Sequence, residues 1–166
     1  ISKAKYFEVG FERYFNNDGE KLVKHYYRQM NKMLESNKPD IIAHIDQVNK
    51  FNRGDFYFSE DEEFYTKATD ETLDMVKQNG AIVEINTRIA YRKLADVFNP
   101  NFKILKKMKA LDIPIVFSAD AHKPDQVCLM LEEAAEAASE AGYKEYYEFT
   151  GKNFQPKALS GIVKKN

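Results

Sequence analysis

The sequence predicts an α/β protein built on a parallel sheet. Short apolar runs too hydrophobic to alternate, as in strands buried on both faces, recur at residues 40–46, 81–86 and 113–117. Amphipathic helical patterns separate these runs, and such alternation is typical of βαβ units. The composition, with 43% hydrophobic and 31% charged residues and a net charge of -1, is that of a globular domain.

The first helix is expected between Asp18 and Pro39. Its opening is acidic, which suits the positive end of the helix dipole, and Pro39 lacks the N–H that a continuing helix needs. Before it, the aromatic-rich residues 1–17 show no clean period and predict a loop, in which a single turn of helix is the alternative. The apolar run at residues 40–46 predicts the first strand.

Two further helices are expected between the strands. Ser59 and Glu62 have the spacing of a capping box, which predicts a helix that starts at Ser59 and ends at the Asn-Gly pair of residues 79–80. The next helix is expected to start at the Asn-Pro pair of residues 99–100. Proline suits the first helical position because the N–H there has no partner within the helix.

The C-terminal part is expected to hold one more helix and one more strand. Residues 124–141 are rich in Ala, Glu and Leu and predict a helix, which Gly142 ends. Residues 144–149 alternate and predict a fourth strand. Residues 151–166 predict a loosely ordered tail, and the whole chain of 166 residues is expected to form a single domain.

Composition also excludes several classes of protein. No basic block is present, so neither a nucleic-acid nor a membrane partner is expected. There is no signal peptide and no apolar run long enough to span a bilayer, and the single cysteine, Cys128, cannot form an internal disulfide. These features predict a cytoplasmic protein. The chain opens on Ile1 without an initiator methionine, so we expect it to be a piece of a longer one.

Polar groups able to do chemistry come at the carboxyl ends of three of the four predicted strands. They are His44 and Asp46, Glu84 and Asn86, and Asp120 and His122. In a parallel sheet these ends share one face, and residues two apart in an extended chain point the same way. Taken singly, His44 reads as a core residue, and Asp120 as a turn cap. Together, His44, Asp120 and His122 predict a divalent cation site, because imidazole and carboxylate suit such an ion.

Three segments resemble the later motifs of the PHP (polymerase and histidinol phosphatase) superfamily, and most closely its histidinol-phosphatase branch. They are residues 40–46, residues 83–87 (Val-Glu-Ile-Asn-Thr) and residues 117–124 (Phe-Ser-Ala-Asp-Ala-His-Lys-Pro). The resemblance runs from about the first helix to the last strand. It implies a distorted TIM-like (β/α)7 barrel, of which this chain is a C-terminal part that lacks the N-terminal strands.

The resemblance also implies an activity and a cofactor. The expected enzyme is a metal-dependent phosphomonoester hydrolase that acts on L-histidinol phosphate in histidine biosynthesis. Its intact site would hold two or three divalent ions (Zn, Mn or Fe), with a small phosphorylated substrate beside them. By motif match, His44, Asp120 and His122 would be ligands. Asp120, or an acid near it, is expected to orient the attacking hydroxide or pass a proton to the leaving group.

Two further sets of residues are expected to contribute to the site, one by contacting phosphate and one by orienting the ligands. Guanidinium groups match phosphate, and the arginines in loops after strand ends are Arg53, Arg88 and Arg92. Residues expected behind the ligands, orienting imidazoles or a substrate amine, are Asp46, Glu84 and Asn86. Glu84 reads equally well as a barrel-interior residue whose partner lies on a neighbouring strand.

The family's early motifs, including a His-x-His pair, are absent from this chain. We therefore expect the chain alone to show little or no turnover. We also expect it to self-associate or to pair with the missing N-terminal part, because removing strands exposes sheet edges. Two alternatives stay open: a PHP phosphoesterase that acts on nucleotides or another small phosphate ester, and a non-catalytic fragment with a structural role.

Overall fold

The computed structural model describes residues 4–94 and 97–162 and shows a mixed α/β fold. The elements, in chain order and with η for a short 3-10 helix, are α1 (Ala4–Phe15), α2 (Gly19–Asn37), β1 (Ile41–Ile42), η1 (Gln47–Phe51), η2 (Arg53–Asp55), α3 (Glu63–Asn79), β2 (Ile82–Asn86), α4 (Arg88–Tyr91), α5 (Phe102–Ala110), β3 (Ile115–Ser118), η3 (Pro124–Gln126), α6 (Leu131–Glu140), β4 (Glu145–Phe149), β5 (Phe154–Ala158) and η4 (Leu159–Gly161).

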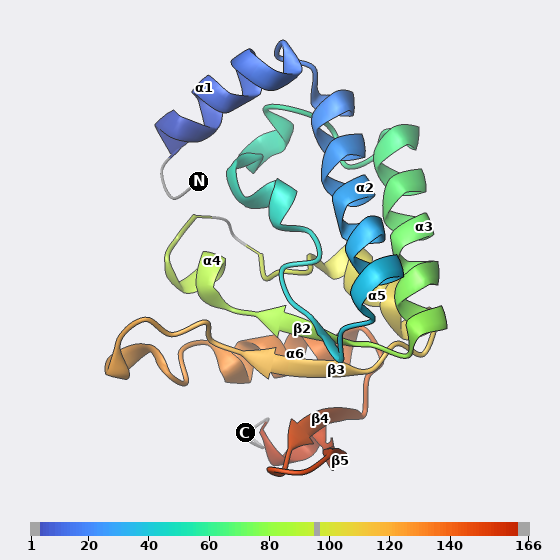
Figure 1. Cartoon of the computed structure of the whole chain (residues 1–166). Helices are drawn as coiled ribbons and strands as arrows, with labels where there is room; N and C mark the ends of the chain where they lie inside the picture. Colours follow the sequence, from blue (N-terminus) through green and yellow to red (C-terminus); the bar gives the residue numbers. More distant parts are fainter. Residues whose placement is uncertain (1–3, 95–96, 163–166) are drawn as a thin grey trace.

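A three-stranded parallel sheet lies at the centre, in the order β1-β2-β3. Ile42 pairs with Val83, and Val83 pairs in turn with Ile115. Helices α2 and α3 lie side by side, and α6 packs against β3 (Figure 1). The prediction of an α/β fold with a parallel sheet is therefore confirmed. Over the described residues the sheet does not close into a barrel.

Helix α2 begins where the sequence predicts. The Oδ1 of Asp18 accepts a hydrogen bond from Lys21 N at 3.0 Å and so satisfies one of the free N–H groups of the first turn. Its apolar face packs against α3, and its buried residues are Leu22, Val23, Tyr27 and Leu34. Burial of a side chain of this size contributes about 1.5–3 kcal/mol. Neither α2 nor any other helix of the described residues combines the length and apolar character needed to cross a membrane.

The core surrounds the middle strand. All five residues of β2 are buried, as expected for a parallel strand covered on both faces. Helix α5 contributes Ile104, Leu105 and Met108 to this core. Helix α6 contributes the three small residues Ala134, Ala135 and Ala138, which are fully buried. This packing fixes β2, and with it the position of the polar side chains at its carboxyl end.

Two predictions for the first part of the chain are wrong. The stretch predicted as a loop forms α1 over Ala4–Phe15, because Phe7, Phe11 and Phe15, spaced four residues apart, lie on one side and pack in or against the core. Residues 1–3 lie outside the described part. The rings of Phe7 and Phe11 both lie 5.0 Å from the ring of Tyr57. The strand predicted over residues 40–46 is limited to Ile41–Ile42, because the chain turns at His44, whose φ is 56°.

The second predicted helix starts later than its capping box. Ser59 caps no helix: its Oγ accepts a hydrogen bond from Asp61 N at 3.2 Å and donates one to Asp55 at 3.0 Å. Helix α3 begins at Glu63, after an extended Glu62. The predicted end of this helix is confirmed, because Gly80 has the left-handed backbone, with a φ of 67°, that ends the helix.

The third predicted helix is also displaced. Asn99 is not helical because its backbone forms a bridge with Asn86, with N–O distances of 2.7 and 3.1 Å. Helix α5 starts at Phe102, where the side chain of Asn101 accepts from Ile104 N at 3.0 Å. The helix start is therefore set by a tertiary contact to the end of β2 rather than by the proline.

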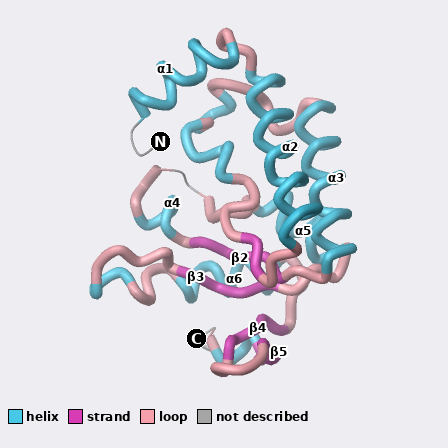
Figure 2. The backbone as a smooth tube through the Cα atoms, viewed as in Figure 1, coloured by secondary structure: helices cyan, strands magenta, loops and turns pink. Residues whose placement is uncertain are grey.

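The C-terminal part differs from the prediction in its pairing. Helix α6 begins only at Leu131, because Met130 has a left-handed backbone with a φ of 58°. The predicted strand at residues 144–149 is present as β4, but it pairs antiparallel with β5 instead of joining the parallel sheet. Figure 2 shows this hairpin below the sheet. Residues 154–161 are therefore ordered, contrary to the predicted loose tail, and residues 163–166 lie outside the described part.

Candidate functional site

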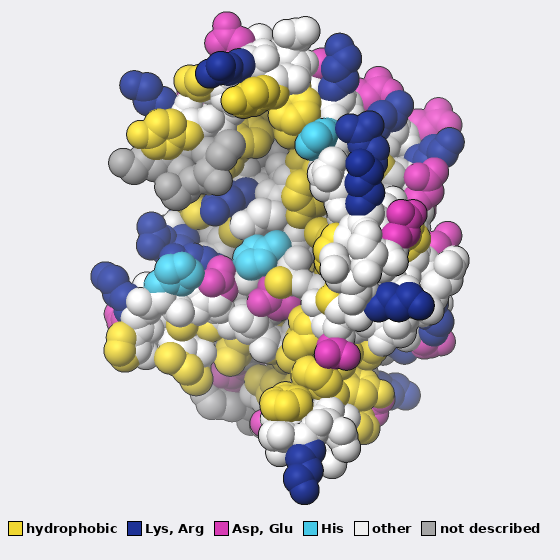
Figure 3. Space-filling model, in the orientation of Figure 1, with side chains coloured by type: hydrophobic (Ala, Val, Ile, Leu, Met, Phe, Trp, Pro, Cys, Tyr) yellow, Lys and Arg dark blue, Asp and Glu magenta, His cyan; other side chains and the backbone are white. Residues whose placement is uncertain are grey.

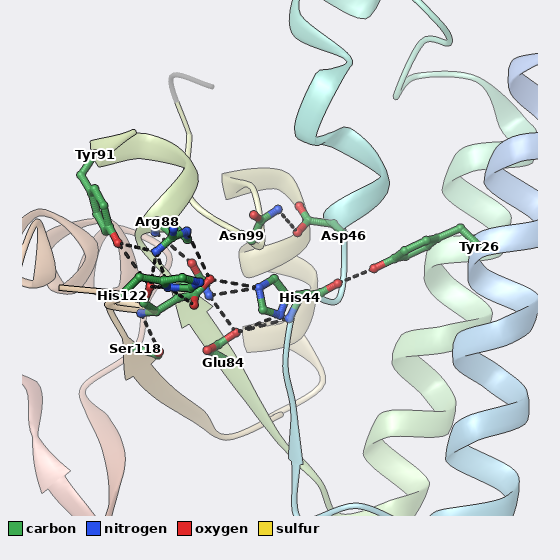
Figure 4. A network of polar contacts seen from close by, with 11 residues as sticks. Tyr26, His44, Asp46, Glu84, Arg88, Tyr91, Asn99, Ser118 and His122 are labelled. Atoms are coloured by element: carbon green, nitrogen blue, oxygen red, sulfur yellow. Dashed lines mark hydrogen bonds and ion pairs between the residues drawn. The ribbon is translucent and has the colours of Figure 1, made fainter. Parts of the chain in front are cut away.

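Side chains from the carboxyl ends of all three parallel strands meet in one cluster, drawn in Figure 4. His44 follows β1, Glu84 and Arg88 come from β2 and the turn after it, and Asp120 and His122 follow β3. The Nε2 of His44 lies 3.4 Å from the Oδ2 of Asp120, and the Nδ1 of His122 lies 3.5 Å from the Oδ1 of the same carboxylate. Asp120 therefore stands between the two imidazoles.

His44 is held in a left-handed conformation by its neighbours. The hydroxyl of Tyr26 donates to the carbonyl oxygen of His44 and accepts from Gln47 N at 3.1 Å. The N–H of His44 donates to the Oε2 of Glu84 at 3.3 Å. Burial raises the pKa of Tyr26, so its hydroxyl keeps the proton that it donates. A positive φ is uncommon outside glycine and persists where surrounding bonds fix it.

Asp120 has a left-handed backbone as well, with a φ of 46°. Its N–H donates to the Oγ of Ser118 at 3.1 Å, which ties it to the last residue of β3. Its carbonyl oxygen accepts from the Nη1 of Arg88 at 2.5 Å and lies 3.3 Å from the hydroxyl of Tyr91. The side chain is thereby left free to face His44.

Glu84 and Asn86 lie on the inner side of the cluster. Glu84 is buried, and its Oε2 accepts from Asn86 Nδ2 at 3.2 Å. The same oxygen is 3.8 Å from the Nδ1 of His44, so the carboxylate faces the nitrogen that points away from Asp120. Asn86 Nδ2 also lies 3.4 Å from the Nε2 of His44. Of the three residues predicted to orient a ligand imidazole or a substrate amine, Glu84 and Asn86 contact His44.

Arg88 reaches into the cluster from the turn after β2. Its Nη1 lies 2.6 Å from the Nδ1 of His122, and its Nε lies 3.8 Å from the Oδ2 of Asp120. The hydroxyl of Tyr91 is 3.2 Å from the same Nη1. The backbone N–H of Arg88 donates to Asn86 Oδ1 at 2.9 Å. The side chain is only 19% exposed, so its charge is placed among the polar groups of the cluster.

Asp46 belongs to a separate network. Its two oxygens accept from Asn99 Nδ2 at 2.7 Å and from Asn101 N at 2.8 Å. The expectation that His44 and Asp46 point the same way is wrong, because the left-handed turn at His44 ends the strand alternation, and Figure 4 shows the two side chains apart. Burial raises the pKa of Asp46 to about 6, against the opposing effect of the two hydrogen bonds.

The network continues from Asp46 to Glu60. Asn101 Nδ2 donates to the Oε2 of Glu60 at 2.6 Å, while Asn101 N donates to Asp46. Partial burial, and next the nearby charge of Asp46, raise the pKa of Glu60 to about 6. This network connects the segment before α3 to the start of α5, and it supports the candidate site from behind.

The other two candidate arginines lie on the surface. Arg53 is in η2 and Arg92 follows α4, and both are exposed, whereas Arg88 lies within the cluster. Figure 3 shows histidine and acidic side chains next to one another below a hollow of this face, with Lys and Arg side chains to their left. Cations and anions therefore share this edge of the sheet.

Two tyrosines of the cluster were not predicted. Tyr91 is three residues after Arg88, a spacing that places both on one side of a helical turn and could have indicated it. Tyr26 fits the apolar stripe of its helix, and its partner is a backbone carbonyl, which leaves no trace in the sequence. Asn99, taken only as a helix start, binds Asp46.

The imidazole and carboxylate groups of the cluster are of the kinds that bind divalent cations in proteins. Donors at about 2.1 Å from a tetrahedral ion lie about 3.4 Å apart, the spacing expected between two of its ligands. The 3.4 Å between His44 Nε2 and Asp120 Oδ2 agrees with that value. Within residues 4–94 and 97–162, however, no three His, Cys, Asp or Glu side chains are grouped as a complete metal site. His122, the third expected ligand, has its Nδ1 turned to Arg88.

A comparison with models of protein families gives no match to this chain, and a comparison with curated proteins gives none either. The case for a function therefore depends on the geometry of the cluster.

Proposed function

We propose that this chain carries the later part of a PHP-type, metal-dependent phosphoesterase site, and that the parent reaction is the hydrolysis of L-histidinol phosphate. One observation carries the proposal: His44 and Asp120 come from separate strand ends and approach to 3.4 Å. The left-handed backbone of both residues adds support, because strained conformations concentrate at functional sites.

The residues that would hold a cation are His44, Asp120 and His122. A divalent ion there would supply a water of lowered pKa and positive charge beside the phosphoryl oxygens. Glu84 lies on the Nδ1 side of His44, 3.8 Å away, and favours a proton on that nitrogen. The Nε2 lone pair then faces Asp120. A carboxylate behind a ligand imidazole is the usual way to orient it.

The chain's own residues would bind the substrate and move a proton. Arg88 carries a planar fork of donors that matches two phosphate oxygens, and it lies beside Asp120. Asp120 has one oxygen toward each imidazole and is 24% exposed, so it can accept a proton from the attacking water or hand one to the leaving oxygen. Arg53 and Arg92 are proposed as additional phosphate contacts from the rim.

A partial barrel is the proposed architecture of the parent domain. Three parallel strands are present, and within this sheet β1 and β3 each have a neighbour on one side only. N-terminal strands of a (β/α)7 barrel would pair with such edges. The same open edges lead us to propose self-association or pairing with the N-terminal part. Sedimentation of residues 1–166 as a monomer at all concentrations would count against this.

Cation binding by residues 1–166 tests the site directly. We expect Co²⁺ or Zn²⁺ to bind, as measured by calorimetry and by the visible spectrum of Co²⁺. The changes His44→Gln and Asp120→Asn should weaken binding at least about tenfold, the order of effect expected even for groups behind the ligands. His25→Gln is the matched control, because His25 is exposed on α2, away from the strand ends. Equal affinity in His44→Gln and the unmodified chain would refute the site.

Turnover tests the substrate. In the full-length parent protein with Mn²⁺ or Zn²⁺, phosphate release from L-histidinol phosphate should exceed release from AMP and from p-nitrophenyl phosphate. A preference for AMP would favour the nucleotide alternative. Absence of turnover with every ester would favour the non-catalytic alternative. Residues 1–166 alone should release little or no phosphate.

A further inference from the structure

We infer that Arg88 is a latch: its guanidinium holds His122 in a form that cannot bind a cation, and a phosphate group that draws Arg88 away releases the imidazole. This inference rests on the proposed function, since it concerns access to the cation site. It assigns Arg88 a second role, besides phosphate contact, in deciding when that site is complete.

The first step is the protonation pattern of the His122 ring. A guanidinium can only donate hydrogen bonds, and its Nη1 lies 2.6 Å from the Nδ1 of His122. The Nδ1 must therefore accept, and a neutral ring then carries its proton on Nε2. In this form Nδ1 is blocked by Arg88 and Nε2 has no lone pair, so neither nitrogen is available to a cation.

The second step concerns the other neutral form of the ring, with its proton on Nδ1, for which a hydrogen-bond acceptor is already present. The carbonyl oxygen of Asp120 is 3.0 Å from the Nδ1 of His122. A proton on Nδ1 could be donated to that oxygen, which would leave the Nε2 lone pair open. Ligand histidines commonly donate their second N–H to a backbone carbonyl in this way. The same carbonyl now accepts from Arg88 Nη1 at 2.5 Å, so the two arrangements compete for it.

The third step concerns the repulsion between the positive charge of Arg88 and a bound cation. The Nε of Arg88 lies 3.8 Å from the Oδ2 of Asp120, the oxygen that also faces His44. A divalent ion shared by His44 and Asp120 would stand within a few ångströms of the guanidinium, and like charges at that range repel. The side chain is mostly buried, so water screens this repulsion weakly. Cation binding and the inward position of Arg88 therefore oppose each other.

The fourth step is what releases the latch. The backbone N–H of Arg88 is bound to Asn86 Oδ1, so the side chain can move while its attachment to the end of β2 stays fixed. A phosphate offers two charged oxygens to the guanidinium fork, in exchange for one nitrogen of His122 and the oxygens of Asp120. Phosphate and cation should therefore bind cooperatively, each increasing the affinity for the other.

The test measures which nitrogen of the His122 ring carries the proton, in the absence of any metal. The chain has three histidines, so long-range proton–nitrogen NMR spectra of the labelled chain contain three ring patterns, which single substitutions assign. We expect the neutral ring of His122 in the unmodified chain to carry its proton on Nε2. Arg88→Gln should move the proton to Nδ1. Inorganic phosphate should produce the same shift in the unmodified chain and none in the variant.

The matched control is Arg28→Gln. Arg28 places its Nη2 3.3 Å from the Nδ1 of His25, the second Arg–His contact of the described residues, and it lies on α2. This change removes the same charge and should alter the pattern of His25 alone. Arg88→Lys, which keeps a positive donor, is the second variant in case the Gln variant folds poorly, and it should give an intermediate pattern.

Cation titration gives the second measurement. Arg88→Gln should bind Co²⁺ about tenfold more tightly than the unmodified chain, the order of effect typical of groups behind metal ligands. If the unmodified chain binds Co²⁺ and the variant binds it equally with an unchanged His122 pattern, the latch is refuted and the proposed function stands. If neither chain binds Co²⁺, the proposed function fails, and the latch fails with it.

Discussion

His44 and Asp120 are 76 residues apart in sequence (120 minus 44), yet their side chains lie 3.4 Å apart. Both have left-handed backbones, with φ values of 56° and 46°. Each turn comes just after a strand of the parallel sheet, where it breaks the alternation of side chains and lets them meet above the strand ends. The backbone at these two positions is thus part of the site.

Removing the hydroxyl of Tyr26 should loosen the turn at His44. Tyr26→Phe leaves the carbonyl oxygen of His44 and the N–H of Gln47 without their present partner. Partly buried groups left unsatisfied cost about 1–3 kcal/mol. We expect a loss of this size in the free energy of unfolding, measured by urea titration, together with weaker Co²⁺ binding.

Tyr14→Phe is the control for this change, because Tyr14 is 72% exposed on α1. It should leave both stability and Co²⁺ binding unchanged. If Tyr26→Phe behaved like Tyr14→Phe in the two measurements, Tyr26 would have no positioning role.

Neutralising Glu84 should affect cation affinity more than stability. In Glu84→Gln the side-chain oxygen can still accept from His44 N and Asn86 Nδ2, so the fold should keep its stability to within about 1 kcal/mol. The negative charge beside His44 Nδ1 is lost, and affinity for Co²⁺ should fall about tenfold. An unchanged affinity would show that Glu84 only fills the interior.

Glu60 should give the protein a pH-dependent stability. Its pKa is raised in the folded state to about 6, chiefly by burial, so the folded state binds a proton more tightly than the unfolded chain. Its contribution to stability is therefore full below the unfolded pKa, about 4.3, and is lost as pH rises through about 6. After discounting for partial exposure, we expect this contribution to be at most about 1 kcal/mol.

Glu60→Gln keeps an acceptor for Asn101 and cannot titrate. The fall in unfolding free energy between pH 4 and 7, measured by urea titration, should be smaller in this variant than in the unmodified chain. Glu63→Gln, a change to an exposed carboxylate in the first turn of α3, is the control. Identical pH profiles for Glu60→Gln and the unmodified chain would contradict the prediction.

Gly19→Ala should destabilise the protein, although alanine favours helices. A Cβ at this first position of α2 would lie 2.3 Å from the backbone oxygen of Tyr57 and 2.8 Å from the Cβ of Phe58. Neither atom can move alone, and overpacking of this kind costs about 1–3 kcal/mol. The melting temperature should fall, whereas Gly161→Ala, which meets nothing within 4 Å, should leave it nearly unchanged.

Much of the fold follows from local pattern. The start of α2 at Asp18, the end of α3 at Gly80 and the buried strand β2 each depend on residues next to one another in sequence, so they were predictable. The errors have tertiary causes. The start of α5 depends on the bridge between Asn86 and Asn99. The pairing of β4 depends on a strand in a segment that has no clear strand pattern.

The sequence predicted which residues form the candidate site better than it predicted how their side chains are arranged. Polar residues at strand ends identified His44, Glu84, Arg88 and Asp120, because parallel strands bring their ends to one edge. Periodicity could not indicate that His44 and Asp46 would diverge, since that follows from a left-handed residue held by tertiary bonds. Nor could it show which of three arginines would enter the cluster.

The three-stranded sheet has a consequence for attempts to reduce the site to a peptide. No single segment supplies the whole cluster: His44 follows β1, Glu84 and Arg88 come from β2 and its turn, and Asp120 and His122 follow β3. A synthetic copy of any one loop would hold the right side chains without the neighbours that give them a shared environment. The smallest excisable unit is the one that still folds all three strands together.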